Sequence, residues 1–289
     1  MTFDLDQSQI DQYLEQGFFA APGLISAADI ATLNEDALRI ARGGYPCEKI
    51  EPLEDELSDT DVLGRYLCIH QPHHISPVMR EFMNHPGICK ALSQIVGAHL
   101  RWWDGRVKCM QSMLFTKPPG FQGNPWHQDE AAIPTRDRSL TGAWIALDDT
   151  TVENGCLLVI PGSHQTGYLH FRYPTEDLDE YDDTTEARDV DESAAVPVEV
   201  KAGTVVFFNG YLMHGSKKNR SDGFRRALVY HYCNAWSLLP WRHASGLADY
   251  RGVTCVVGDD PYEWRGTEPL DPDQIWLRPC RAMAERQRE

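Results

Sequence analysis

Short β-rich runs, each bounded by Gly, Pro, Asn or Asp, constrain the fold of this sequence more than any other feature. Between residues 106 and 233, runs rich in Val, Ile, Leu, Phe and Tyr alternate with these turn residues. The runs cover residues 106–117, 140–148, 156–160, 196–200, 204–209 and 226–233. Many short strands separated by turn signals predict an all-β sandwich or barrel.

The region before residue 100 has a helical pattern instead. In the stretch 27–42, apolar residues recur at helical spacing, Ser26 precedes them as a candidate N-cap, and two glycines follow. The other expected helices cover residues 8–16, 77–84 and 87–96, and a loop is expected around 45–61. Helices followed by strands predict a mainly β jelly roll with flanking N-terminal helices.

The length of 289 residues suits a single domain over residues 1–289. We expect a mainly helical part over about 1–100, a β core over about 101–235 and a C-terminal extension over 236–289. We see no internal repeat and no linker that requires a second domain.

The formal net charge of −16 limits the partners of the protein. Nucleic acids and anionic membrane surfaces attract clustered Lys and Arg, so neither is expected as a partner. No apolar run approaches the roughly 18 residues of a membrane span. The start of the sequence lacks the basic and apolar regions of a secretory signal, so we expect a cytoplasmic protein. The oligomeric state stays open.

Residues 174–193 form an acidic segment with ten Asp or Glu and a single basic residue, Arg188. One interpretation is a solvated surface loop between strands. The other is a mobile lid over a pocket, because long loops on a rigid scaffold often carry function. The two interpretations are compatible.

The first chemical signal is the pair His127 and Asp129, two residues apart in PWHQD. On an extended strand, side chains at i and i+2 point the same way, so both can reach one metal ion. The pair alone is weak evidence, but His214 follows a Val- and Phe-rich run, and Arg225 comes eleven residues later. Two His and one carboxylate are typical of non-haem iron oxygenases, although catalytic zinc sites use similar ligands. Arg225 favours an oxygenase, because its guanidinium suits the terminal carboxylate of a cosubstrate.

Five stretches in a fixed order resemble the phytanoyl-CoA dioxygenase (PhyH) family of Fe(II)/2-oxoglutarate-dependent oxygenases. They are KPPG at 117–120, PWHQD at 125–129, WIALDD at 144–149, ENGCLLVIPGSH at 153–164 and HGSKKNRSDGFRRAL at 214–228. The resemblance implies a double-stranded β-helix, a cupin-like jelly roll that agrees with the strand pattern. It also implies that His127, Asp129 and His214 are the iron ligands and the catalytic set.

The resemblance further implies a cosubstrate site. Arg225 matches the residue that binds the distal carboxylate of 2-oxoglutarate, and Ser216 matches a hydroxyl that assists it. Trp144 and Gln111 lie at strand positions that face the pocket in similar enzymes. In related halogenases a small residue replaces the carboxylate ligand, so Asp129 indicates an oxidation without halide. Many relatives also place a Lys or another polar group on an earlier segment, for which no counterpart aligns here.

Other polar residues are expected to have structural roles. Arg226 follows Arg225 on the same strand, so only one of the two can point inward, and Arg226 should pair with acidic groups. His164, in PGSH, is typical of a turn at a strand end. The histidines of HQPHH are interrupted by Pro, which predicts a surface loop or pocket rim rather than a metal cluster; they are His70, His73 and His74.

We therefore expect a non-haem iron(II)- and 2-oxoglutarate-dependent dioxygenase that hydroxylates an unactivated C–H bond of a small-molecule metabolite and releases succinate and CO2. Its cofactor and cosubstrates would be Fe(2+), 2-oxoglutarate and O2, with ascorbate as a candidate reductant. The charge favours a neutral or amine-bearing substrate over a polyanionic one. The substrate and the choice between hydroxylation, desaturation and ring chemistry stay open.

Two alternatives stay open. One is a cupin-like metal-dependent hydrolase or isomerase that does not use 2-oxoglutarate. The other is a catalytically silent β-helix binding protein.

Overall fold

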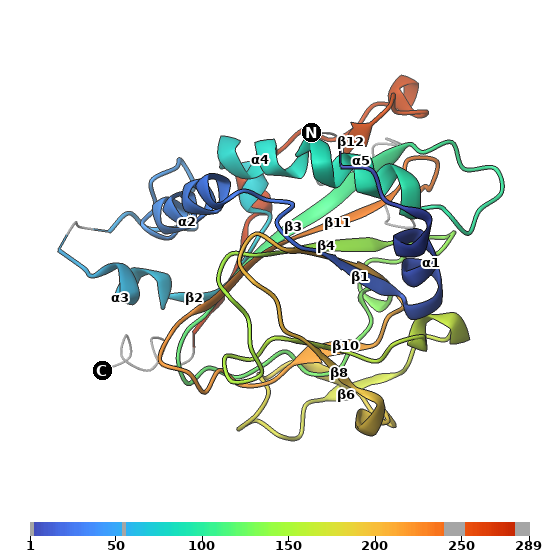
Figure 1. The fold of residues 1–289 in the computed structure, drawn as a ribbon. Helices are drawn as coiled ribbons and strands as arrows, with labels where there is room; N and C mark the ends of the chain where they lie inside the picture. The colour runs from blue at the N-terminus through green and yellow to red at the C-terminus, as the bar shows by residue number, and fades with distance from the viewer. Residues whose placement is uncertain (1–2, 54–55, 240–251, 281–289) are drawn as a thin grey trace.

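Two antiparallel β-sheets form the centre of the computed structural model, which describes residues 3–53, 56–239 and 252–280 (Figure 1). Within these residues the larger sheet has eight strands. In order across the sheet they are β1 (Phe18–Ala21), β9 (Val205–Asn209), β4 (Thr141–Ala146), β11 (Arg225–Asn234), β3 (Val107–Lys117), β2 (Tyr66–His70) and β13 (Trp276–Pro279), and β12 (Thr254–Val257) also pairs with β3.

The smaller sheet faces the larger one. Its strands, in order, are β10 (His214–Ser216), β5 (Leu157–Val159) and β8 (Val196–Val198). A separate hairpin joins β6 (Arg172–Pro174) to β7 (Thr185–Ala187). The two facing sheets confirm the expected mainly β, cupin-like jelly roll.

The helices cover the outer face of the larger sheet. They are α1 (Gln7–Gln16), α2 (Ala27–Ala41), α3 (Asp59–Leu63), α4 (Pro77–Met83) and α5 (Pro86–Ile95). Figure 1 shows α2, α4 and α5 on the side of this sheet that faces away from β8 and β10. Ser26 caps α2 as expected, because its hydroxyl accepts a hydrogen bond from the Asp29 N–H at 3.1 Å. The short helix α3 begins at the end of the loop that was expected around 45–61.

Alternation along β11 separates the two faces of the larger sheet. Leu228 and Tyr230 point outward into the main core under the helices, and the Tyr230 hydroxyl donates to the Met79 carbonyl of α4 at 2.6 Å. Ala227 and Val229 point inward and pack between the two sheets. Each fully buried large side chain contributes about 1.5–3 kcal/mol, so this pattern strongly favours a single orientation of the strand.

The larger sheet extends beyond the expected β core. Strands β1 and β2 come from the N-terminal part, and β12 and β13 come from the C-terminal extension. Each of these strands has only four or five residues, too few for a periodic pattern to identify them. Residues 240–251 and 281–289 of the extension lie outside the described residues, and the division of the chain into three parts stays a prediction. Among the described helices, none is both long and apolar enough to cross a membrane.

Candidate metal centre and cosubstrate pocket

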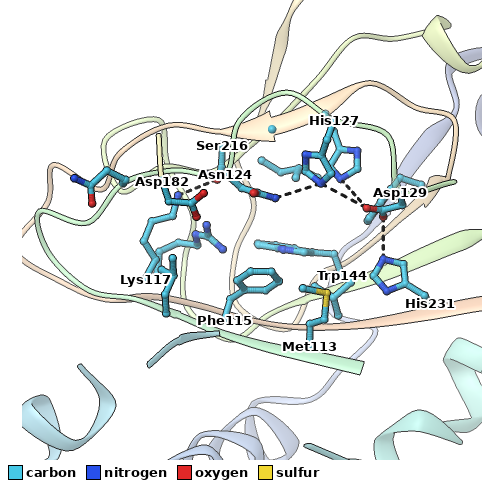
Figure 2. A pocket seen from close by; sticks show the side chains of 18 residues that line it. Met113, Phe115, Lys117, Asn124, His127, Asp129, Trp144, Asp182, Ser216 and His231 are labelled. Carbon is cyan, nitrogen blue, oxygen red and sulfur yellow. Dashed lines mark hydrogen bonds and ion pairs between the residues drawn. The ribbon is translucent and has the colours of Figure 1, made fainter. Parts of the chain in front are cut away.

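A pocket lies between the two sheets and is lined by side chains from both (Figure 2). The larger sheet contributes residues from alternate positions of neighbouring strands, as expected when one face of a sheet forms a wall. On β3 and β11 these residues are Met113, Phe115, Lys117, Arg225, Val229 and His231. The smaller sheet and its approach segments contribute His127, Asp129, Leu157, His214 and Ser216.

The structure brings His127, Asp129 and His214 together at one end of this pocket. One candidate ligand atom from each lies within 4.8 Å of the others. The backbones of His127 and His214 pair as an isolated antiparallel bridge, with N···O distances of 2.9 and 3.0 Å. Gln128, between the first two ligands, has extended dihedral angles, and Asp129 begins the 3-10 helix Asp129–Ala131. The extended stretch expected here is therefore short, but His127 and Asp129 still turn to the same side.

The backbone fixes the orientation of both imidazole rings. The His127 Nδ1–H donates to the Pro125 carbonyl at 2.7 Å, and the His214 Nδ1–H donates to the Leu212 carbonyl at 2.9 Å. Each ring therefore presents the lone pair of Nε2 to the pocket. The two Nε2 atoms lie 3.5 and 3.7 Å from Asp129 Oδ1, a separation that suits three ligands around one small cation.

The protonation states of Asp129 and His214 suit the binding of a cation. Burial opposes ionisation of Asp129, but the neighbouring His231 and His214 hold its pKa well below 3.8. Burial and then the charge of His127 lower the pKa of His214 to about 4. A carboxylate next to a neutral imidazole is the protonation state that metal binding requires. The Asn124 Nδ2 atom lies 3.2 Å from His127 Nε2, so a bound metal would replace this contact.

The other end of the pocket is cationic. Arg225 is buried, and burial lowers its pKa to about 10. In the described part of the chain its Nε atom has no hydrogen-bond partner. The guanidinium carbon lies 5.9 Å from the centroid of the Trp144 ring, which forms part of the pocket wall. A buried guanidinium with an unused donor is suited to an anionic ligand.

Lys117 lies beside this guanidinium and was not assigned a role from the sequence. Its ammonium donates to Ser216 Oγ at 2.9 Å, to the Lys217 carbonyl at 2.7 Å and to the Gly155 carbonyl at 3.3 Å. Burial and then the charge of Arg225 lower the pKa of Lys117 well below 10.5, and the charge of Asp182 partly opposes them. Lys117 lies at an even spacing from Met113 and Phe115 on β3, so its side chain faces the same side of the sheet. This alternation is the sequence signal that could have placed it in the pocket.

Gln111 is the one expected pocket residue that does not line the cavity. Its side chain instead contacts His231, with 3.2 Å between Gln111 Nε2 and His231 Nδ1. His231 lines the pocket next to Asp129 and was missed in the sequence, although it lies an even number of residues after Arg225 on the same strand.

Two of the structural interpretations are confirmed. Arg226 forms a two-pronged ion pair with Asp148, with N···O distances of 2.9 and 2.6 Å. His164 lies in a 3-10 turn and its Nε2 contacts the Leu14 carbonyl at 3.0 Å.

The interpretation of HQPHH as a surface loop or pocket rim was wrong. His73 and His74 are 1% and 4% exposed within the 3-10 helix Pro72–His74, and His73 Nδ1 lies 2.6 Å from Ser112 Oγ. Packing of β2 and β3 under this turn buries a sequence that looks polar and irregular in isolation.

The acidic segment 174–193 packs against the pocket. Its residue Asp182 lines the cavity and forms an ion pair with Arg278 of β13. Backbone hydrogen bonds join it to the segment before His127, with Gly123 N to Glu180 O at 2.8 Å and Asp182 N to Gly123 O at 2.9 Å. The segment therefore contributes to the pocket wall, while its motion stays a prediction.

The fold and this geometry define a class: a cupin-like double-stranded β-helix with a candidate centre of two histidines and one carboxylate. Residues 13–227, more than half of the chain, match the family model described as Phytanoyl-CoA dioxygenase (PhyH). The chain therefore belongs to the phytanoyl-CoA dioxygenase family.

Curated relatives agree with this membership. The chain is 34% identical over 172 residues to a probable phytanoyl-CoA dioxygenase of Caenorhabditis elegans, covering 55% of this chain and 51% of the relative. It is 36% identical over 178 residues to phytanoyl-CoA dioxygenase 1 of Oryza sativa subsp. japonica, covering 60% of each. The matches thus span only about half to three fifths of these relatives.

A solved structure supports the fold. The epimerase SnoN in complex with Fe3+, alpha ketoglutarate and nogalamycin RO is 21% identical, with a TM-score of 0.61 over 94% of this chain and 97% of that chain.

Proposed function

We propose that this chain is a non-haem Fe(II)- and 2-oxoglutarate-dependent dioxygenase that hydroxylates a small-molecule substrate. One observation carries the proposal: a single pocket holds the His127, Asp129 and His214 group at one end and the buried guanidinium of Arg225 at the other, whose Nε has no hydrogen-bond partner among the described residues. A bidentate 2-oxo acid with a second carboxylate matches both ends. The ligands named for SnoN, in the same fold, are consistent with this match.

The residues at the metal end would hold Fe(II) through His127 Nε2, His214 Nε2 and one oxygen of Asp129. When bound, Fe(II) supplies the reaction of 2-oxoglutarate with O2 to succinate and CO2, coupled to insertion of one oxygen atom into a substrate C–H bond. The Nδ1 hydrogen bonds to backbone carbonyls keep both rings from rotating.

The residues at the cationic end would bind the distal carboxylate of 2-oxoglutarate. The Ser216 Oγ atom accepts hydrogen bonds from Lys117 Nζ at 2.9 Å and from the Asn124 N–H at 3.1 Å. Because both lone pairs of the hydroxyl oxygen are then used, its own proton is available to a carboxylate in the pocket. Arg225 adds a charged donor, and the apolar walls at Trp144 and Phe115 exclude water from the site.

The substrate is proposed to be neutral or amine-bearing. The support is the net charge of −16 and the position of Asp182, which brings the acidic segment to the pocket wall. We further propose that residues 1–289 act as one oxygenase domain. A cytoplasmic location stays a prediction.

Succinate release tests the proposal. Purified protein with Fe(II), ascorbate and O2 should convert 2-oxoglutarate to succinate, slowly alone and faster with a substrate drawn from neutral and amine-bearing metabolites. His127→Ala should lose both activities. No succinate under any of these conditions, with Fe(II) shown to be bound, would refute the oxygenase.

A metal-dependent hydrolase or isomerase is the competing enzyme class. It has no use for a second carboxylate, so 2-oxoglutarate should not raise the unfolding temperature of its metal-loaded form. A dioxygenase should show this stabilisation, and Arg225→Met should remove it. A silent binding protein should retain the stabilisation but never release succinate.

A further inference from the structure

His231 contacts Asp129, the carboxylate among the three candidate metal ligands. It contacts the carboxylate oxygen that points away from His127 and His214. Its side chain is 3% exposed, and its Nε2 lies 2.8 Å from Asp129 Oδ2. The other oxygen, Oδ1, is the one that faces His127 and His214. Figure 2 shows His231 and His127 on different sides of the Asp129 carboxylate.

Gln111 favours the tautomer of His231 that this hydrogen bond requires. Its amide nitrogen lies 3.2 Å from His231 Nδ1 and 3.6 Å from Met113 Sδ. The Met113 thioether can only accept a hydrogen bond, so the amide nitrogen is the Gln111 atom on this side, and its second N–H faces His231 Nδ1. Because Nδ1 of His231 then accepts, its ring proton is on Nε2 and donates to Asp129 Oδ2. Gln111 and His231 are direct cross-strand partners of β3 and β11, which holds the chain of contacts in place.

A free carboxylate can bind a cation through one oxygen or through both. If Asp129 bound through both oxygens, it would take one of the three positions that a facial set of two histidines and a carboxylate leaves open. Bidentate 2-oxoglutarate and O2 together need all three. A hydrogen bond that occupies Oδ2 therefore limits how many coordination positions Asp129 can take on the metal.

We infer that His231, oriented by Gln111, is a positioning residue that keeps Asp129 a one-oxygen ligand and so preserves the open positions for 2-oxoglutarate and O2. This inference rests on the proposed function. A purely structural His231 would fill space between β3, β4 and β11, and its loss would lower stability without changing the number of ligands on the metal.

The test measures the metal directly. Anaerobic Mn(II)-loaded protein is examined by water-proton relaxation, which reports the number of exchangeable waters on the ion, and by titration with 2-oxoglutarate. The variants are His231→Leu, His231→Gln, whose amide can still donate to Asp129, and Gln111→Leu. The matched control is His70→Leu, because His70 is the direct partner of Met113 on β2, and in the described chain its Nε2 has no hydrogen-bond partner.

We expect three waters on Mn(II) in the wild type and the control, and two in His231→Leu. The Kd of 2-oxoglutarate should rise about 10-fold in His231→Leu, which is the lower end of the loss in metal affinity or activity that follows removal of a support of a metal ligand. His231→Gln should restore most of both quantities. If His231→Leu does not fold, Gln111→Leu should show the same changes in part.

Unchanged water number and unchanged 2-oxoglutarate affinity in the folded variants would overturn the inference while leaving the proposed function intact. A wild-type protein that binds neither Mn(II) nor 2-oxoglutarate would instead overturn the proposed function. A lower unfolding temperature with an unchanged water number would assign His231 a structural role only.

Discussion

Lys117 and Ser216 should bind 2-oxoglutarate as one unit, although only Ser216 would touch it. The perturbation is Lys117→Met, which keeps roughly the length of the side chain and removes its hydrogen-bond donors. The variant deletes the 2.9 Å hydrogen bond to Ser216 Oγ and leaves the Asn124 N–H as the only donor to that oxygen in the described part of the chain. The Ser216 hydroxyl is then free to rotate away from the ligand.

The magnitude follows from the hydrogen bonds that are lost. A hydrogen bond to a charged group contributes about 1.5–3 kcal/mol, so Ser216→Ala should raise the Kd of 2-oxoglutarate about 10- to 100-fold. Lys117→Met should raise it about 10-fold, because the Ser216 hydroxyl loses the hydrogen bond that orients it. The double variant should lose less than the sum, with a coupling of about 1 kcal/mol, since both changes disable the same donor.

The assay is anaerobic calorimetric titration of the Mn(II)-loaded protein with 2-oxoglutarate. Lys218→Met is the matched control, because Lys218 pairs with exposed Asp179 outside the pocket. Urea unfolding must accompany the titration, since Lys117→Met also removes a donor from two backbone carbonyls. Additive losses, or a Lys117→Met variant with the affinity of the control, would refute the reasoning.

Three further predictions concern the adjacent residues Arg225 and Arg226, the buried carboxyl of Glu130 and the closely packed Gly123. Arg225→Met should abolish stabilisation by 2-oxoglutarate, whereas Arg226→Met should preserve it but lower the free energy of unfolding by about 1–2 kcal/mol; thermal shifts and urea unfolding compare the two. Glu130 is buried, which raises its pKa to about 7. The native state therefore binds more protons than the unfolded state between pH 4.5 and 7, and stability should fall as pH rises through that window, by about 2 kcal/mol from pH 5.5 to 7. Glu130→Gln should flatten this profile in urea titrations at the two pH values. A Cβ on Gly123 would lie 1.7 Å from the Ser216 carbonyl oxygen, so Gly123→Ala should lower the free energy of unfolding by about 3 kcal/mol and weaken 2-oxoglutarate binding, as urea unfolding and titration would show.

The sequence predicted the elements whose pattern is local and long enough to recognise. The eleven residues of β3 and the ten of β11 carry clear β-rich runs, and α2 carries a cap and an apolar stripe. The candidate metal ligands could be predicted for the same reason. His127 and Asp129 are near neighbours in the sequence, and Arg225 follows His214 at a spacing that resembles a known family.

Contacts between residues far apart in the chain could not be predicted from the sequence. Lys117 and Ser216 are 99 residues apart, and His231 and Asp129 are 102 residues apart. No local pattern encodes such a contact, because it depends on which strands become neighbours and in which register. The same limit explains His73, whose burial depends on the packing of its turn against β3.

The register of one strand pair connects the two ends of the site. Pairing of β3 with β11 places Arg225 opposite Lys117 and His231 opposite Gln111. A slip of β11 by one residue would turn Arg225 and His231 toward the helices and would move Tyr230 from the core into the pocket. The packing of β11 against α4 therefore specifies the site as well as the stability. The register that buries Tyr230 and Tyr232 is also the one that directs Arg225 and His231 into the pocket.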